Sequence, residues 1–396
     1  MRKTLSILFL VLMTDLFLYA NGGSEATNSA KQGEGPIKIG SIMDLTGSAS
    51  NAGQPHSWGV QHAVDEVNAE GGINGRKIEL YTQDCKNDVT EGLNAYHKLV
   101  DEIGVCAIIG PALSNPASAW VEISAEDKIP IVGHFMDESC TTNPDTGETY
   151  EYMFLVEPSC GQQARDIAEF GIKELNQRKF AVLYNPSNAF AKAQVDPFVK
   201  YVQDSGCEVV ASETFGWSDK DYSAQALKIV NSGAECVFLG DYLGQMLIAY
   251  DALRDAGFSG KVLGANTMAP PFAAQVKNKA IDCYFLQNYD MTNPNRGVFF
   301  EMVSQQMKET GTTSPQVNVG FGRDAVQVLV SAMRQAKNPT DGEELARLLA
   351  QTKDVEMSDG QKYTINAQHR TDTLGMYIAT YDANGQMQIC GYEQMK

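Results

Sequence analysis

Residues 37–83, IKIGSIMDLTGSASNAGQPHSWGVQHAVDEVNAEGGINGRKIELYTQ, contain the pattern that decides the fold. Two short apolar runs, at 37–43 and 77–83, enclose an amphipathic stretch at 57–72 whose apolar residues fall on one side of a helix. A strand, a helix and a second strand arranged in this way form a βαβ unit, in which the two strands lie parallel. The stretch therefore predicts an α/β protein built on a parallel sheet.

The same alternation continues along the chain in two series of similar length. The first series adds strands at 106–110 and 129–133 and helices at 90–103 and 116–128. The second series has strands at 179–185, 207–215, 235–241, 261–266 and 283–289, with helices at 162–175, 191–206, 223–233, 243–257 and 270–278. Two series predict two doubly wound parallel-sheet lobes, which suits a chain of 396 residues because single cores seldom grow beyond about 250–300 residues.

The C-terminal part departs from this alternation. Consecutive helices are expected at 295–310, 318–336 and 341–351, and the tail 373–393 has two alternating runs around a turn at 383–385, which predicts a hairpin. These late elements are expected to pack back onto the earlier lobes through a hinge of several crossovers. We therefore assign residues 37–158 plus 293–357 to an N-terminal lobe and 159–292 plus 358–396 to a C-terminal lobe.

The first twenty residues have the features of a secretory signal. Arg2 and Lys3 precede an apolar stretch that ends on a small residue. We expect a signal peptide at 1–26, a flexible tether at 27–36, and a periplasmic or extracytoplasmic protein. A permanent membrane anchor is the alternative, although Asp15 interrupts the apolar run.

Charge and cysteine usage narrow the classes of function. A net charge of -18, from 31 basic and 49 acidic residues, argues against nucleic acid and anionic membrane surfaces as partners. The eight cysteines form no CxxC motif and the histidines no HxxxH motif, so neither a metal site nor a cofactor is expected. Cys140 and Cys160 flank one polar loop and are the pair we expect to form a disulfide.

Residues 108–118, IIGPALSNPAS, form a small, hydroxyl-rich corner between a predicted strand and a predicted helix. Ligands of open α/β sheets bind at this end of the strands. Ser114 or Asn115 can cap the helix, and the amides beside them can attract a carboxylate, although a plain cap is the alternative. The corner lacks the lysine of a P-loop and the GxSxG of a serine hydrolase, so binding is favoured over catalysis.

Four stretches carry a resemblance to a known family: 37–54, 63–84 (AVDEVNAEGGINGRKIELYTQD), 108–119 and 128–133. In them the chain resembles the type I periplasmic solute-binding proteins of ABC importers, in the branched-chain amino-acid and amide-binding group. The resemblance implies two lobes, joined by three crossovers, that close on a small ligand such as an amino acid. It further implies a monomer without enzymatic activity or cofactor, which delivers its ligand to a membrane permease.

The resemblance also implies where the ligand lies in the first lobe. Ser114 stands where family members hold the ligand carboxylate, with Asn115 beside it. In the loop 134–139, HFMDES, the ligand-facing positions are Phe135 and Asp137, and an aspartate there favours an ammonium or amide donor over a carboxylate. Near the first strand, Ala52 stands where many relatives have an aromatic residue, and the polar candidates beside it are Ser48 and Asn51.

In the second lobe the resemblance points to strand ends. The ligand-binding candidates are Phe190, Asp241, Tyr242, Asn266 and, on a late helix, Phe321. Asn266 approximates a position where amino-acid binders often have an acid, so Asp137 or Asp241 would have to meet the ammonium. The expected function is capture of a small amino acid or related amide or carboxylate for an ABC importer. The alternative is a sensor that passes the closed form to a signalling receptor.

Overall fold

The computed structural model describes residues 35–393 except 291, 294, 296 and 314. The expected signal peptide and residues 27–34 of the expected tether lie outside the described residues. Within the described ranges, no helix combines the length and the apolar character needed to cross a membrane.

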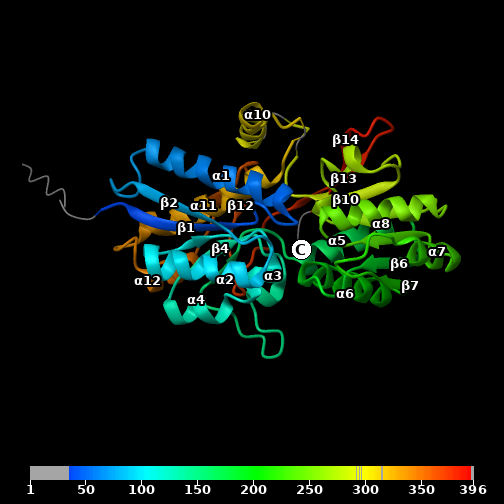
Figure 1. Ribbon diagram of the computed structural model, residues 1–396, viewed down its shortest axis with the longest axis horizontal. Helices are drawn as coiled ribbons and strands as arrows, with labels where there is room; N and C mark the ends of the chain where they lie inside the picture. The colour runs from blue at the N-terminus through cyan, green and yellow to red at the C-terminus, as the bar shows by residue number, and fades with distance from the viewer. Residues whose placement is uncertain (1–34, 291, 294, 296, 314, 394–396) are drawn as a thin grey trace, which may run out of the picture. The chain divides into compact units, whose positions relative to one another are not determined.

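The first sheet is parallel throughout and has the strand order β2-β1-β3-β4-β5 (Figure 1). Its strands are β1 (Ile37–Met43), β2 (Ile78–Asp84), β3 (Ile108–Ile109), β4 (Ile131–Gly133) and β5 (Met153–Leu155). Its residues are almost all buried except in the edge strand β2, which is the pattern of a parallel sheet covered on both faces.

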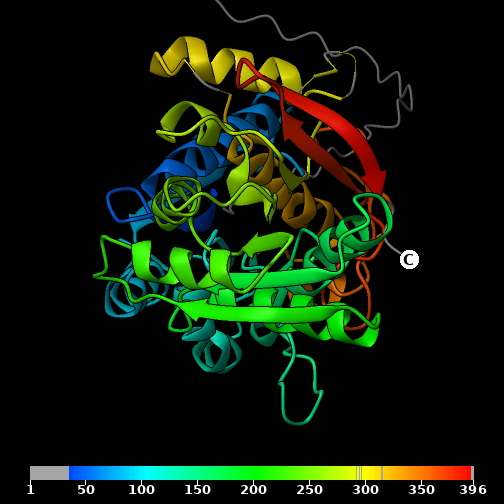
Figure 2. The same ribbon diagram turned by 90° about the vertical axis from the view of Figure 1, so that its right-hand side faces the viewer.

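The second sheet has the order β14-β13-β10-β9-β8-β6-β7. Its parallel part consists of β6 (Lys179–Tyr184), β7 (Glu208–Thr214), β8 (Cys236–Leu239), β9 (Lys261–Gly264) and β10 (Cys283–Gln287). The expected C-terminal hairpin is present as β13 (Met376–Tyr381) and β14 (Met387–Glu393), which extend this sheet antiparallel at one edge (Figure 2). Two doubly wound lobes are therefore confirmed.

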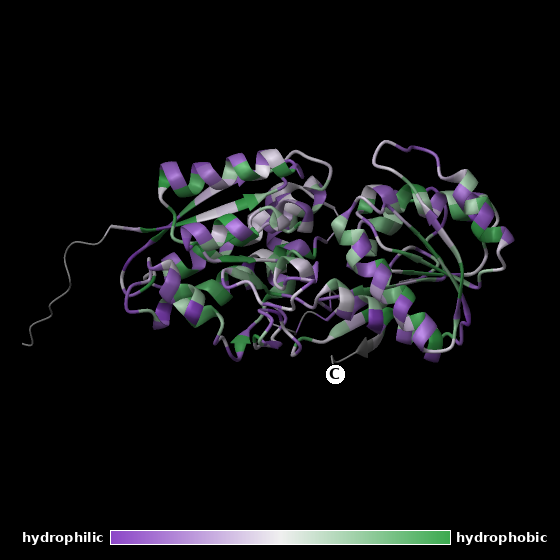
Figure 3. Ribbon diagram, turned by 90° about the horizontal axis from the view of Figure 1, so that it is seen from below, coloured by the Kyte–Doolittle hydropathy of each residue, from purple (hydrophilic) through white to green (hydrophobic). Residues whose placement is uncertain are grey.

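Helices cover both faces of each sheet, and their apolar sides face the strands (Figure 3). In the first lobe one face is covered by α1 (Ser50–Ala69), α11 (Asn318–Gln335) and α12 (Gly342–Leu349), and the other by α2 (Val89–His97), η1 (Lys98–Ile103), α3 (Ser114–Ser118) and α4 (Val121–Asp127). In the second lobe α5 (Cys160–Lys173) and α6 (Ala189–Asp204) cover one face. The other face is covered by α7 (Ser223–Asn231), α8 (Leu243–Asp255) and α9 (Phe272–Gln275). Helix α10 (Phe299–Thr310) lies instead against α1 and α11 of the first lobe, where Glu309 accepts a hydrogen bond of 2.8 Å from Trp58 Nε1.

The chain passes between the lobes at three places. It leaves the first lobe after β5, returns between β10 and α11, and enters the second sheet again at β13. Residues 358–374 were expected in the C-terminal lobe, but Tyr363, Ile365 and Leu374 pack in the core of the first lobe. The short hairpin of β11 (Val355–Glu356) and β12 (Lys362–Tyr363) precedes this last crossing, so the chain changes lobe near residue 375.

Two further differences concern α1 and the cysteines. Helix α1 begins at Ser50, seven residues before the expected start, although Pro55 lies inside it. The expected disulfide between Cys140 and Cys160 is not formed. Both thiols are buried and lie near backbone oxygens instead, Cys140 Sγ at 3.7 Å from Ser114 O and Cys160 Sγ at 3.8 Å from Phe190 O.

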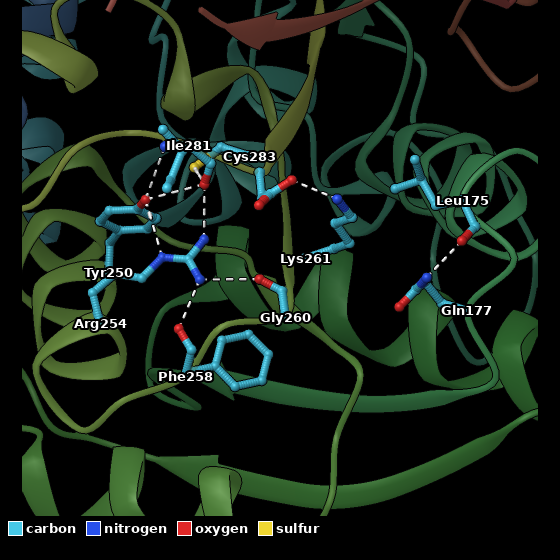
Figure 4. Close-up of polar contacts among 10 residues, drawn as sticks. Leu175, Gln177, Tyr250, Arg254, Phe258, Gly260, Lys261, Ile281 and Cys283 are labelled. Atoms are coloured by element: carbon cyan, nitrogen blue, oxygen red, sulfur yellow. Dashed lines mark hydrogen bonds and ion pairs between the residues drawn. The ribbon is translucent and has the colours of Figure 1, made fainter. Parts of the chain in front are cut away.

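At the end of the second sheet where its parallel strands begin, an arginine ties the connecting loops together (Figure 4). Arg254, in α8, donates from Nη1 to Phe258 O at 2.8 Å and to Gly260 O at 3.0 Å, and from Nη2 to Ile281 O at 2.8 Å. Its Nε donates to Tyr250 Oη at 3.1 Å. This end of the lobe is closed by structural hydrogen bonds, whereas the opposite end of the strands carries the site described next.

Candidate ligand-binding site

A cavity lies where the carboxyl ends of the strands of both sheets meet. Leu113, His134 and Glu157 reach it from segments that follow β3, β4 and β5, and Phe190 and Tyr242 from segments that follow β6 and β8. The cavity contains about 720 Å³ of empty space, its mouth included. Because both lobes contribute walls, a ligand held here would contact both at once, as is usual at the strand ends of α/β sheets.

Aromatic rings form much of the wall. Phe190 and Tyr242 stack with their ring centroids 5.2 Å apart, and His134 stacks on Phe321 at 4.6 Å. His56, in α1, lies behind this wall without lining the cavity and meets the edge of His134 at 5.0 Å. All five rings are at least nine-tenths buried, so a ligand in the cavity faces mostly apolar, water-poor surface.

The two histidines are neutral in this environment. Burial lowers the pKa of His56 to about 3, and burial together with His56 lowers the pKa of His134 well below its usual value. Among the described residues neither ring nitrogen of His56, nor Nδ1 of His134, has a hydrogen-bond partner. His134 therefore adds polar but uncharged atoms to the cavity wall, and His56 lies next to it behind the wall.

An acid and two amides form a hydrogen-bonded row at the crossovers. Asn288 follows β10 and donates to Glu157 Oε2 at 3.0 Å, while Asn266 donates to Asn288 Oδ1 at 3.3 Å. Glu157 is 2% exposed, and burial raises the pKa of its carboxyl well above the usual range. Since Glu157 and Asn288 lie on two different crossing segments, the row links the lobes beside the cavity.

Six of the twelve residues expected at the site line this cavity, and the structure brings them together from both lobes. They are Asn51, Ala52, Phe190, Tyr242, Asn266 and Phe321. Asn51 and Ala52 belong to the first turn of α1 and not to a loop.

Ser114, Phe135 and Asp137 form a layer next to the cavity without lining it. Ser114 is 1% exposed, and its Oγ accepts a hydrogen bond of 3.2 Å from Asp137 N. The Asp137 carboxylate caps η2 (Glu138–Cys140) by accepting from Ser139 N at 2.9 Å, and burial raises its pKa. Phe135 is fully buried in the core of the first lobe.

Asn115 contacts the second lobe. Its Nδ2 donates to Asn188 Oδ1 and to Tyr242 Oη, each at 3.1 Å, and its Oδ1 accepts from Ala189 N at 3.0 Å. The side chain thus joins α3 to the start of α6 across the gap between the lobes. This contact, together with the Glu157–Asn288 bond, holds the lobes against each other on two sides of the cavity.

Asp241 and Ser48 have partners outside the cavity. Asp241 accepts from Asn185 N at 3.1 Å, Asn188 Nδ2 at 2.8 Å and Tyr242 N at 2.7 Å, so it organises the ends of β6 and β8. Burial, partly offset by these donors, raises its pKa to about 6. Ser48 is exposed and accepts from Asn87 Nδ2 at 3.0 Å.

The sequence reasoning did not name several residues that line the cavity. The most informative are His134, Met136, Glu157, Thr267, Pro271 and Asn318. His134 lies in the loop 134–139, so its position at the end of a predicted strand was the available signal. Glu157 follows β5, a strand that the sequence did not predict. Among the described residues, no three acids, histidines or cysteines are grouped in a way that could hold a metal ion.

Comparisons with known proteins agree with this arrangement. A family model described as periplasmic binding protein matches residues 36–386. The Leu/Ile/Val-binding protein BraC3 of Rhizobium johnstonii is 26% identical over 82% of this chain and 86% of its own length. The Leu/Ile/Val-binding protein homolog 3 of Brucella melitensis is 29% identical over 59% of this chain, and that match spans 62% of the Brucella protein.

A solved structure supports the same relationship. The branched-chain amino acid transporter substrate-binding protein LivJ from Streptococcus pneumoniae, in complex with isoleucine, superposes with a TM-score of 0.79. The match has 25% identity and covers 90% of this chain and 99% of LivJ. The family and these relatives are binding proteins and not enzymes. This chain belongs to the periplasmic binding protein family, as a type I member related to the Leu/Ile/Val-binding proteins.

Proposed function

We propose that the protein is the extracytoplasmic solute-binding component of an ABC importer. It captures a small amino acid, or a related amide or carboxylate, between its two lobes and delivers the ligand to a membrane permease. The observation that carries the proposal is the cavity of about 720 Å³, lined from both lobes and largely apolar.

The position of the cavity between the lobes explains how ligand binding would close them. A ligand that touches both walls gains contacts only when the lobes are together, so it shifts the equilibrium toward the closed form. Phe190, Tyr242 and Asn266 would then contact the ligand from the second lobe, and Asn51 and Ala52 from the first. In this proposal Ser114 and Asp137 support the first-lobe wall from behind.

A thermal-shift screen tests the proposal. Amino acids, amides, urea-like compounds and small carboxylates would each be added to the purified protein. A ligand that binds only the folded state stabilises it by RT ln(1 + [L]/Kd), or about 2.7 kcal/mol at a hundredfold excess over Kd. We expect at least one of these compounds to raise the melting temperature, with one ligand per chain by calorimetry. A screen without any shift would contradict the proposed ligand class.

A further inference from the structure

The described lining of the cavity contains one carboxylic acid and no positively charged side chain. Among the described residues that line it, Glu157 is the only carboxylate, and there is no lysine or arginine. His134 is the one nitrogen base in the lining, and burial keeps it neutral. The wall therefore offers a ligand no positively charged side chain, and the one group that can become an anion beside a cationic ligand is Glu157.

The other nearby acids are already engaged by the protein. Asp241 accepts three hydrogen bonds from its own lobe, and Asp137 caps η2. Neither lines the cavity. Glu157 differs, because Asn288 donates to Oε2 and no described residue donates to Oε1. A buried carboxylate with an unfilled oxygen is costly unless a donor or a cation completes it.

The protein by itself supplies no positive charge to Glu157. Without one, burial favours the protonated acid, which is why the pKa of Glu157 is raised. A ligand cation would reverse this preference, since an opposite charge within a few ångströms favours the carboxylate.

The remaining wall also suits a cation. Phe190, Tyr242 and Phe321 present aromatic rings, whose faces attract ammonium and amidinium groups, most strongly when water is excluded. The same rings provide apolar area for the carbon skeleton of the ligand. A carboxylate placed among these groups would meet no basic side chain of the wall and would gain no ion pair there.

We propose that the ligand carries a cationic nitrogen, an ammonium or amidinium group, which pairs with Glu157 while the carbon skeleton lies against the aromatic rings. This inference rests on the proposed solute-binding function and narrows it. In this arrangement the cationic group of the ligand is bound at the segments that cross between the lobes. Glu157 would accept from the ligand and also accepts from Asn288, which lies on a second crossing segment. A ligand whose only charge is a carboxylate would find no oppositely charged side chain in this wall.

Four probes with nearly the same carbon skeleton separate the possibilities. They are leucinamide and 3-methylbutylamine as cations, leucine as a zwitterion, and 4-methylpentanoate as an anion. Binding of each to the full-length mature protein would be measured by calorimetry and thermal shift at pH 7. We expect both cations to bind, leucine to bind no more tightly than leucinamide, and 4-methylpentanoate not to bind.

Two variants test whether Glu157 binds the cationic group of the ligand. Glu157→Gln keeps the shape and the oxygen that accepts from Asn288, but it removes the charge. We expect it to weaken binding of both cations at least tenfold, while circular dichroism and the urea midpoint show an intact fold. Glu213→Gln is the matched control, because Glu213 pairs with Lys228 at 2.9 Å on the second lobe, away from the cavity lining. It should leave all affinities unchanged.

Each result has a distinct meaning. Binding of 4-methylpentanoate without binding of the cations would overturn the inference but leave the solute-binding function standing. Equal binding of the cations to Glu157→Gln and to the unchanged protein would also overturn it, because Glu157 would then have only a structural role. If neither these probes nor any compound of the wider screen binds, the solute-binding proposal fails as well.

Discussion

At the residue scale, His56 is the most unusual buried group beside the site. Its imidazole is fully buried, and neither of its nitrogens has a hydrogen-bond partner among the described residues. The folded state keeps this ring neutral, whereas the unfolded chain protonates it below pH 6.5. Stability is therefore lost as the pH falls from about 6.5 toward 3, by at most ~1.4 kcal/mol per pH unit.

Replacing His56 with leucine should remove both the unpaired nitrogens and this pH dependence. We expect His56→Leu to raise the free energy of unfolding by about 1–3 kcal/mol at pH 8 through loss of unsatisfied polar atoms. The gain should be larger, by about 2 kcal/mol, at pH 5. Urea unfolding at both pH values measures this, and His97→Leu, at an exposed position, is the control. A gain that is the same at pH 5 and pH 8 would contradict the assignment.

Residues at the site differ in how far the sequence could predict them. Phe190, Tyr242 and Asn266 lie at or after the ends of predicted strands, where the family resemblance placed the ligand. Glu157 follows β5, which was not predicted, and only its burial makes this acid a candidate. Its position depends on Asn288, which is 131 residues away.

At the scale of the elements, α1 and α11 pack closely against each other. A methyl group added to Gly59 would overlap the carbonyl oxygen of Val319, and one added to Gly322 would overlap that of His56. The two helices therefore approach through their glycines. This contact fixes the start of α11, where Val319 and Phe321 pack with the second lobe while the rest of the helix packs with the first.

Gly59→Ala should destabilise the protein although alanine is the better helix former. We expect a loss of about 1–3 kcal/mol or more, because backbone atoms must move to make room. Gly244→Ala in α8 is the matched control, since an added methyl there meets nothing within 4 Å. It should stabilise by about 0.5–1 kcal/mol. Chemical denaturation compares the two, and similar effects of both substitutions would show that the helix crossing is not tight.

Element prediction succeeded where the hydrophobic period was regular and failed where a contact between elements decided the boundary. The second-lobe strands and the helix α11 begin and end within about two residues of the expected positions. The early start of α1 at Ser50 was missed, because Gly53 and Pro55 are poor helix formers and packing outweighs their propensity.

At the scale of the whole molecule, Asn115 connects the two lobes. Asn115→Ala removes three hydrogen bonds that reach Asn188, Ala189 and Tyr242. With a net value of about 0.5–1.5 kcal/mol each, their loss should favour separation of the lobes. We expect a larger radius of gyration in small-angle X-ray scattering and weaker binding of any ligand found by thermal shift.

Ser118→Ala tests whether this effect is specific to the contact between lobes. Ser118 is exposed in the same helix, and its Oγ donates to Asn115 O at 2.9 Å, within the first lobe. Its replacement should leave the scattering profile and the affinity unchanged. An unchanged radius of gyration in Asn115→Ala would mean that the remaining contacts, such as Glu157 with Asn288, suffice to hold the lobes together.

The sequence by itself determined the α/β class, the two lobes, the late hairpin and the family, because these depend on periodicity and on contiguous motifs. Only the tertiary structure decided which residues line the cavity, which ones join the lobes, and where the chain crosses for the last time. Asn115 and Tyr242 are separated by 127 residues, and Glu157 and Asn288 by 131. A local sequence pattern cannot predict such pairs, because their contact depends on how the two folded lobes pack against each other.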